Sequence, residues 1–168
     1  MTKHFYKLAI TFILLLQSSG FPQFWEYQVS GTTQHLNGVH MLDTQTGWIC
    51  GDAGTLLKTS NSGQNWTQVN ATVNDLNSIL FKDASLGVAV GDDGTIIRTT
   101  NGGTNWFVVA SGTTEQFRKV SSGSGNTFFA AGDNGLISVS TDNGATWNLK
   151  NAGTNIRFRG TAATASNK

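Results

Sequence analysis

The acidic side chains are the residues with the clearest capacity for chemistry. Two carboxylates about 5–10 Å apart on opposite sides of a glycosidic bond can hydrolyse it. Asp43, Asp75 and Asp83 lie in loops with no evident partner. The other aspartates after the N-terminal segment stand in short glycine-containing turns, where a carboxylate accepts hydrogen bonds from nearby backbone N–H groups: Asp52, Asp92, Asp93, Asp133 and Asp142. The acidic residues therefore predict turns, and we expect no catalytic residue.

Other kinds of site have weaker support in the sequence. His35 and His40 have no third metal ligand nearby. No Gly-x-Ser-x-Gly elbow, P-loop or dinucleotide fingerprint is present. Cys50 is the single cysteine, and Val90 and Ala131 take its place in related segments, so we expect a buried thiol. The sequence thus predicts no metal site and no cofactor.

One octamer occurs three times, and the chain is organised around it. Residues 140–147 read STDNGATW, residues 99–106 read TTNGGTNW, and residues 59–66 read TSNSGQNW. Their tryptophans stand 40 and 41 residues apart. A fixed period of this length indicates a repeat architecture. The pattern S/T-x-D-x-G-x-T-W is the Asp-box, also called the BNR repeat.

The residue types of the octamer fit a turn. Asp or Asn at the third position can accept hydrogen bonds from N–H groups further along, glycine supplies a positive φ, and tryptophan anchors the turn by burying its ring. A calcium loop is the alternative, but the oxygen ligands at alternate positions and the closing acidic residue are missing. The predicted structural residues are Asn61, Gly63, Trp66, Asn101, Gly103, Trp106, Asp142, Gly144 and Trp147.

Around each octamer, short apolar runs alternate with Gly-Asp-x-Gly turns, which predicts four antiparallel strands per repeat. Such a unit is one blade of a β-propeller. We expect an all-β fold with three full blades, over about 36–70, 76–110 and 117–150. Residues 25–30 match the outer strand of a preceding blade, and 156–168 match the start of a following one.

Three blades with orphan strands at both ends fall short of the usual minimum of about four. We therefore expect a partial propeller, the front portion of a longer one. The alternative is a ring assembled from several short chains. Open blade faces also make self-association an expectation.

The first 20 residues resemble an export signal. Lys3 and Lys7 precede an apolar run over 8–16, and small residues follow before Phe21. A retained membrane anchor is the alternative, although the run is shorter than a span requires. We expect a signal peptide over 1–20, a propeller over 21–168 and no membrane span after cleavage. The predicted location is periplasmic, extracellular or on the cell surface.

The charge balance argues against nucleic-acid binding. The chain has a formal net charge of +1, and 12% of its residues are charged. Nucleic-acid binders usually carry a strongly basic face.

With the Asp-boxes, the Gly-Asp-x-Gly turns and the Leu-Asn blade starts in place, the chain resembles the photosystem II stability/assembly factor family of BNR propellers and its secreted bacterial relatives. The resemblance covers most of residues 25–161. It implies a non-catalytic binding or assembly module that holds a protein or glycan partner through blade loops. A location in the thylakoid lumen is implied only for a photosynthetic source.

Four basic residues are the predicted partner-binding set: Arg118, Lys119, Arg157 and Arg159. Arg118 and Arg159 occupy the same place in successive repeats and could together receive an anionic group. Ordinary solvated charge is the alternative.

A fragment of an Asp-box glycoside hydrolase, sialidase-like or xyloglucanase-like, is the alternative function. Sialidases share the repeat but need an arginine triad, a tyrosine nucleophile with its glutamate and an acid/base aspartate. After the signal, Tyr27 is the only tyrosine, and Glu26 and Glu115 are the only glutamates.

Overall fold

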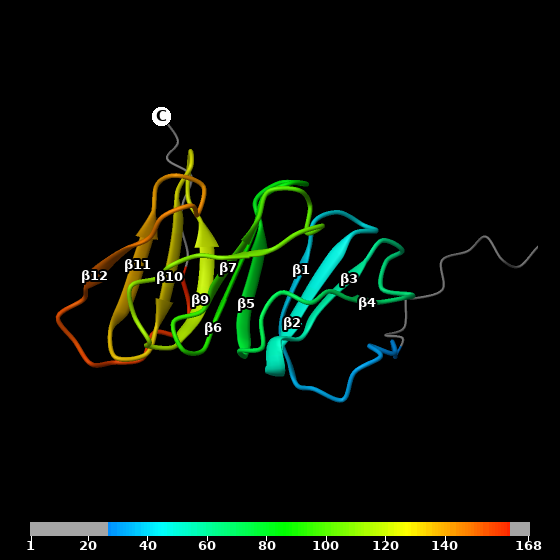
Figure 1. The fold of residues 1–168 in the computed structure, drawn as a ribbon, viewed down its shortest axis with the longest axis horizontal. Coiled ribbons are helices and arrows are strands. Elements are labelled where there is room, and N and C mark those ends of the chain that lie inside the picture. The colour runs from blue at the N-terminus through cyan, green and yellow to red at the C-terminus, as the bar shows by residue number, and fades with distance from the viewer. Residues whose placement is uncertain (1–26, 162–168) are drawn as a thin grey trace, which may run out of the picture.

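Three four-stranded antiparallel sheets stand side by side in the protein (Figure 1). The structure is a computed structural model that describes residues 27–161. The predicted signal peptide over 1–20 and the predicted strand residues 25–26 and 162–168 lie outside this range. The sheets have the orders β1-β2-β3-β4, β5-β6-β7-β8 and β9-β10-β11-β12, and we call them blades 1, 2 and 3. The prediction of a partial propeller with three complete blades is confirmed.

The strands follow the repeat closely. Blade 1 contains β1 (Leu36–Met41), β2 (Gly47–Gly51), β3 (Leu56–Thr59) and β4 (Thr67–Gln68). Blade 2 contains β5 (Leu76–Phe81), β6 (Gly87–Gly91), β7 (Ile96–Thr99) and β8 (Phe107–Val108). Blade 3 contains β9 (Phe117–Ser122), β10 (Phe128–Gly132), β11 (Leu136–Ser140) and β12 (Asn148–Asn151).

The Gly-Asp-x-Gly segments form the tight turns between the second and third strands. Ala53, Asp93 and Asn134 have φ values of 51°, 52° and 53°, and the glycine after each also has a positive φ. Two consecutive positive φ values suit the right-handed twist of a hairpin, and they explain why glycine follows in every copy. In blade 1 the turn forms the 3-10 helix η1 (Asp52–Gly54).

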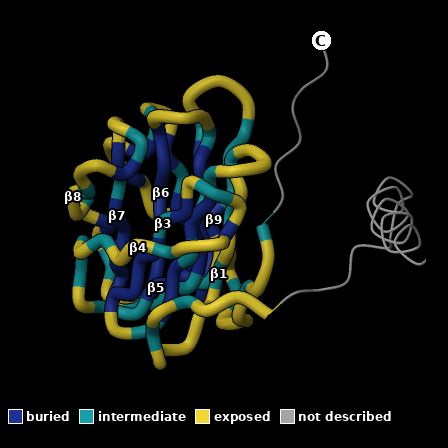
Figure 2. The backbone as a smooth tube through the Cα atoms, turned by 90° about the vertical axis from the view of Figure 1, so that its right-hand side faces the viewer, coloured by how far each residue is buried: buried dark blue, intermediate teal, exposed yellow. Residues whose placement is uncertain are grey.

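The hydrophobic core lies between blades. One cluster joins Trp48, Cys50 and Leu56 of blade 1 to the inner strand β5 and to Ala89 and Ile97 of blade 2. A second cluster joins Val88, Val90 and Ile96 of blade 2 to the facing side of blade 3. Figure 2 shows the same pattern, with buried strands in the interior and exposed loops around them. Each blade therefore buries its apolar side chains against its neighbour.

The outer strands and the two described ends depart from the regular pattern. The outer strands β4 and β8 are only two residues long each. Residues 27–30 and 156–161 lie in no strand, although the Phe158 N–H donates to the carbonyl of Gly132 at the end of β10 at 2.9 Å. Gln28 donates a hydrogen bond to the carbonyl of Ser62 at 3.3 Å. Over residues 27–161, no helix has the length and apolar character that a membrane span requires.

Candidate functional site

The second residue of each inner strand faces a common hollow. Asn37 on β1, Asn77 on β5 and Arg118 on β9 occupy this repeated position, and Arg159 follows at the same position after blade 3. Together with Arg157 they line a hollow of about 290 Å³. Because β1 contacts β5 and β5 contacts β9, the hollow follows the innermost strands of the arc.

An aspartate from the tight turn of the same blade holds each of the first three residues. Asn37 Nδ2 donates to Asp52 Oδ1 at 2.7 Å, and Asn77 Nδ2 donates to Asp92 Oδ1 at 2.7 Å. In blade 3, Arg118 donates from Nε and Nη2 to the two oxygens of Asp133, at 3.0 and 2.8 Å. The same 15-residue spacing thus gives an amide–carboxylate pair twice and a bidentate ion pair once.

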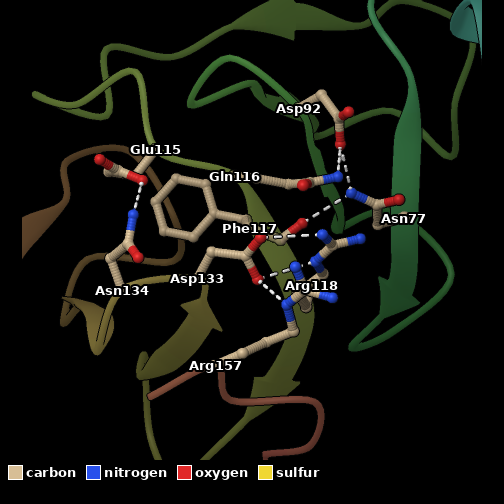
Figure 3. Close-up of polar contacts among 9 residues, drawn as sticks. All are labelled: Asn77, Asp92, Glu115, Gln116, Phe117, Arg118, Asp133, Asn134 and Arg157. Carbon is tan, nitrogen blue, oxygen red and sulfur yellow. Dashed lines mark hydrogen bonds and ion pairs between the residues drawn. The ribbon is translucent and has the colours of Figure 1, made fainter. Parts of the chain in front are cut away.

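The two asparagines also connect neighbouring blades. Asn37 Nδ2 donates to the carbonyl of Leu76 at 3.1 Å. Asn77 Nδ2 donates to the carbonyl of Phe117 at 2.8 Å (Figure 3). Each amide therefore fixes the spacing between two inner strands. Asn37 and Asn77 were not among the predicted site residues, although they stand at the position of Arg118 in their own repeats, and this equivalence was a usable signal.

Two guanidinium groups share one carboxylate at this site. Arg157 Nε lies 2.8 Å from Asp133 Oδ1, on the carboxylate that also holds Arg118 (Figure 3). The hydrogen bonds from Arg118 lower the pKa of Asp133, and the same contact raises the pKa of Arg118. Arg159 forms no ion pair with any residue in the described range. Among the described residues, three guanidinium groups and no carboxylate line the hollow, while Asp52, Asp92 and Asp133 contact its Asn37, Asn77 and Arg118 from outside the lining.

The predicted basic set is only partly brought together. Arg118, Arg157 and Arg159 line the hollow, but Lys119 does not. Side chains alternate along a strand, so Lys119 projects from β9 on the side opposite Arg118.

A sequence comparison agrees with the blade structure. The family profile described as Photosynthesis system II assembly factor YCF48 matches residues 18–115, more than half of the chain. The chain belongs to this family. No curated protein sequence matches it significantly.

Solved structures of YCF48 share the fold. A structure described as YCF48 bound to D1 peptide superposes with a TM-score of 0.63 at 23% identity, over 70% of this chain. YCF48 from Cyanidioschyzon merolae gives a TM-score of 0.61 at 20% identity, also over 70% of this chain. The match covers 40% of each YCF48 chain. An ancestral GH74 enzyme gives 0.60 at 19% identity, covering 71% of this chain and 19% of the enzyme.

Beside the basic hollow of this YCF48-family chain lies an acidic one of about 410 Å³. Its acidic lining residues are Asp92, Asp93, Glu115 and Asp133, and Arg157 stands between the two hollows. Gln116 donates to Asp92, and Asn134 donates to Glu115 at 2.8 Å (Figure 3). A general acid in a glycosidase needs a raised pKa, whereas Arg118 lowers that of Asp133.

The three Asp-boxes repeat one hydrogen-bond pattern. The hydroxyl of Thr59, Thr99 or Ser140 accepts the N–H of the box glycine at 2.9–3.0 Å. The Asn or Asp two residues later accepts a backbone N–H near the end of the box, also at 2.9–3.0 Å. Trp147 is buried, but Trp66 and Trp106 are half-buried. The hydroxyl and the amide or carboxylate oxygen of each box are therefore engaged in holding the turn.

The remaining carboxylates and the thiol also have local roles. Asp43 accepts the N–H groups of residues 45 and 46, and Asp83 accepts those of residues 85 and 86. Asp75 accepts the N–H of Ala53 at 2.7 Å. Burial raises the pKa of Cys50 to about 12. Within residues 27–161 no three acidic, histidine or cysteine side chains gather as a metal site would require.

Proposed function

We propose that this chain is a non-catalytic module that is exported and holds an extended protein segment on its inner-strand face. The basic hollow carries the proposal. Asp133 holds two of its guanidinium groups, those of Arg118 and Arg157, so these two lose little side-chain entropy when they bind an anionic group.

Membership of the YCF48 family supports an assembly role, and a relative with the same fold has been solved with a D1 peptide. A peptide is therefore the preferred class of partner, ahead of a glycan. A carboxylate on that peptide would pair with Arg159, which has no competing carboxylate among the described residues.

The test is fluorescence anisotropy with a labelled acidic peptide and the same peptide with Asn and Gln replacing Asp and Glu. We expect the purified protein to bind the acidic peptide more tightly, and salt to weaken this binding. Arg159→Gln should weaken binding about tenfold or more, since a charge-assisted hydrogen bond is worth about 1.5–3 kcal/mol. Lys150→Gln, on the exposed outer strand β12, is the matched control.

Equal binding of both peptides, or equal losses for the two variants, would contradict this role. The alternative is a glycoside hydrolase fragment, for which the acidic hollow is the supporting observation. Turnover of a fluorogenic sialoside or of xyloglucan, lost in Glu115→Gln, would favour it.

A further inference from the structure

The face that each blade turns toward the next is covered in blades 1 and 2 and open in blade 3. Val88, Val90 and Ile96 of blade 2 are fully buried under blade 3. Their counterparts in blade 3 are Phe129, Ala131 and Ile137, 41 residues later in each case. These three line a hollow of about 300 Å³, and Phe129 and Ile137 are only half-buried. The apolar surface of blade 3 is therefore partly open, whereas the equivalent surface of blade 2 is covered.

The opposite face of blade 1 is also open. Leu36, Val39 and Met41 on β1 are 42%, 65% and 45% exposed. Their counterparts on β5 are Leu76, Ile79 and Phe81, which are at most 5% exposed because blade 1 covers them. The exposure of β1 thus comes from the absence of a covering sheet in the described residues.

We propose that these two open faces bind each other between copies of this chain, so that blade 1 of one copy packs head to tail on blade 3 of a second. The chain carries both halves of an interface that it forms twice internally, between blades 1 and 2 and between blades 2 and 3. Such a contact is heterologous, and repeated rotation can close it into a ring. The described residues of two copies give six blades, within the usual range of about four to eight, so a closed dimer is the assembly that we expect.

Two segments of the chain occupy parts of these faces and would have to move. Phe158 lines the hollow on blade 3 but is only half-buried. On blade 1, Gln28 takes the Ser62 carbonyl at 3.3 Å. The equivalent carbonyls of Gly102 and Asn143 are taken by Lys58 and Arg98 of the preceding blade, at 3.0 and 2.7 Å. Gln28 thus makes, through one long hydrogen bond, the contact that a cation of the preceding blade makes in blades 2 and 3.

The junction between copies should be weaker than the internal ones. In blade 3, Val139 stands at the position that Lys58 and Arg98 have in blades 1 and 2. Blade 3 therefore offers no cation at this position to donate to the Ser62 carbonyl of the second copy. Apolar contact alone would hold the two copies together, and the dimer should dissociate at low concentration.

Sedimentation velocity over a concentration series tests the proposal. The purified protein is expected to shift from monomer to dimer as concentration rises. Val39→Asp removes one face and Ile137→Asp removes the other, so each variant alone should remain monomeric. An equimolar mixture should recover a dimer, because one intact copy of each face remains and a single junction can form.

Two further variants sharpen the result. Phe107→Asp, at a rim position 62% exposed on β8, should leave the dimer unchanged. Phe158→Ala should raise the dimer fraction by freeing the blade 3 face. Circular dichroism shows whether each variant is folded. If Ile137→Asp does not fold, Val39→Asp, which is at an exposed position, still tests the interface by itself.

A protein that stays monomeric at every concentration overturns the proposal. So does dimerisation of folded Val39→Asp by itself, which would indicate a different interface. Failure of two folded variants to recover a dimer on mixing would do the same.

Discussion

Single polar residues in this protein mainly fix backbone turns. The carboxylate of Asp142 accepts the N–H of Thr146 at 2.9 Å, the hydroxyl of Thr146 at 2.6 Å and the hydroxyl of Ser140 at 2.8 Å. These hydrogen bonds, led by the one from the Thr146 hydroxyl, lower the pKa of Asp142 to about 2. Asn61 and Asn101 hold the same turn in the other boxes without a charge. Blade 3 therefore has a pH-sensitive version of a turn that blades 1 and 2 form with a neutral amide.

Asp142→Asn is expected to remove this pH dependence and keep the fold. A carboxyl whose folded pKa is about 2, against 3.8 ordinarily, stabilises the folded state above pH 3.8. That contribution is lost as the pH falls through about 2. Urea unfolding at pH 7, 4 and 2 should give the wild-type protein a larger free energy of unfolding than the variant at pH 7 and 4. The difference between the two should become smaller toward pH 2. A difference in unfolding free energy that stays constant with pH would refute this account. Asp93→Asn, in an exposed turn, serves as the control.

Elements that are specified locally could be predicted from the sequence, and those that depend on the next blade could not. The Gly-Asp-x-Gly turns and Asp-boxes fixed the number and direction of the strands, because backbone conformation at these positions depends on nearby residues. The half-burial of Trp66 and Trp106 was not predicted, since burial of a ring depends on the sheet beside it. Of the predicted basic set, Arg118, Arg157 and Arg159 line the hollow and Lys119 does not. The two asparagines were missed for another reason, because the prediction followed charge and not the repeated position that they share with Arg118.

Contacts between blades include a repeated cation. Lys58 Nζ donates to the Gly102 carbonyl at 3.0 Å and also lies 5.1 Å from the centre of the Trp48 ring. Arg98 Nε donates to the Asn143 carbonyl at 2.7 Å. Each cation thus connects the third strand of one blade to the Asp-box of the next.

Arg98→Met should destabilise the protein by about 1–2 kcal/mol. The apolar part of the side chain is kept, but a charge-assisted hydrogen bond worth about 1.5–3 kcal/mol is lost, reduced here because Arg98 is half-exposed. Lys58→Met should have a similar effect on the junction between blades 1 and 2. Chemical unfolding measures both variants against Lys150→Met on the exposed outer strand. Equal stability of all three variants would show that the inter-blade cation contributes nothing.

At the scale of the molecule, residues 27–161 form an array of three blades joined by two apolar interfaces. One cluster lies between blades 1 and 2 and the other between blades 2 and 3. In such arrays each unit is stabilised by its own sheet and by its nearest neighbours. Blade 2 is covered on both sides, whereas blades 1 and 3 each have an open face, so the ends should be the first parts to open.

Trp48→Ala is expected to uncouple blade 1 from the rest. The Trp48 ring stacks on Phe81 at 5.2 Å, meets Trp106 edge to face at 5.7 Å, and packs so close to Gly103 that a Cβ there would lie 2.2 Å away. Removing a buried ring of this kind costs about 3–5 kcal/mol. Hydrogen exchange should show early loss of protection in β1, β2 and β3, while β6, β9 and β10 remain protected by the second cluster. Trp66→Ala, at a half-buried position on the open face, should lose much less protection. Uniform loss across all three blades in Trp48→Ala would mean that the array unfolds as one cooperative unit.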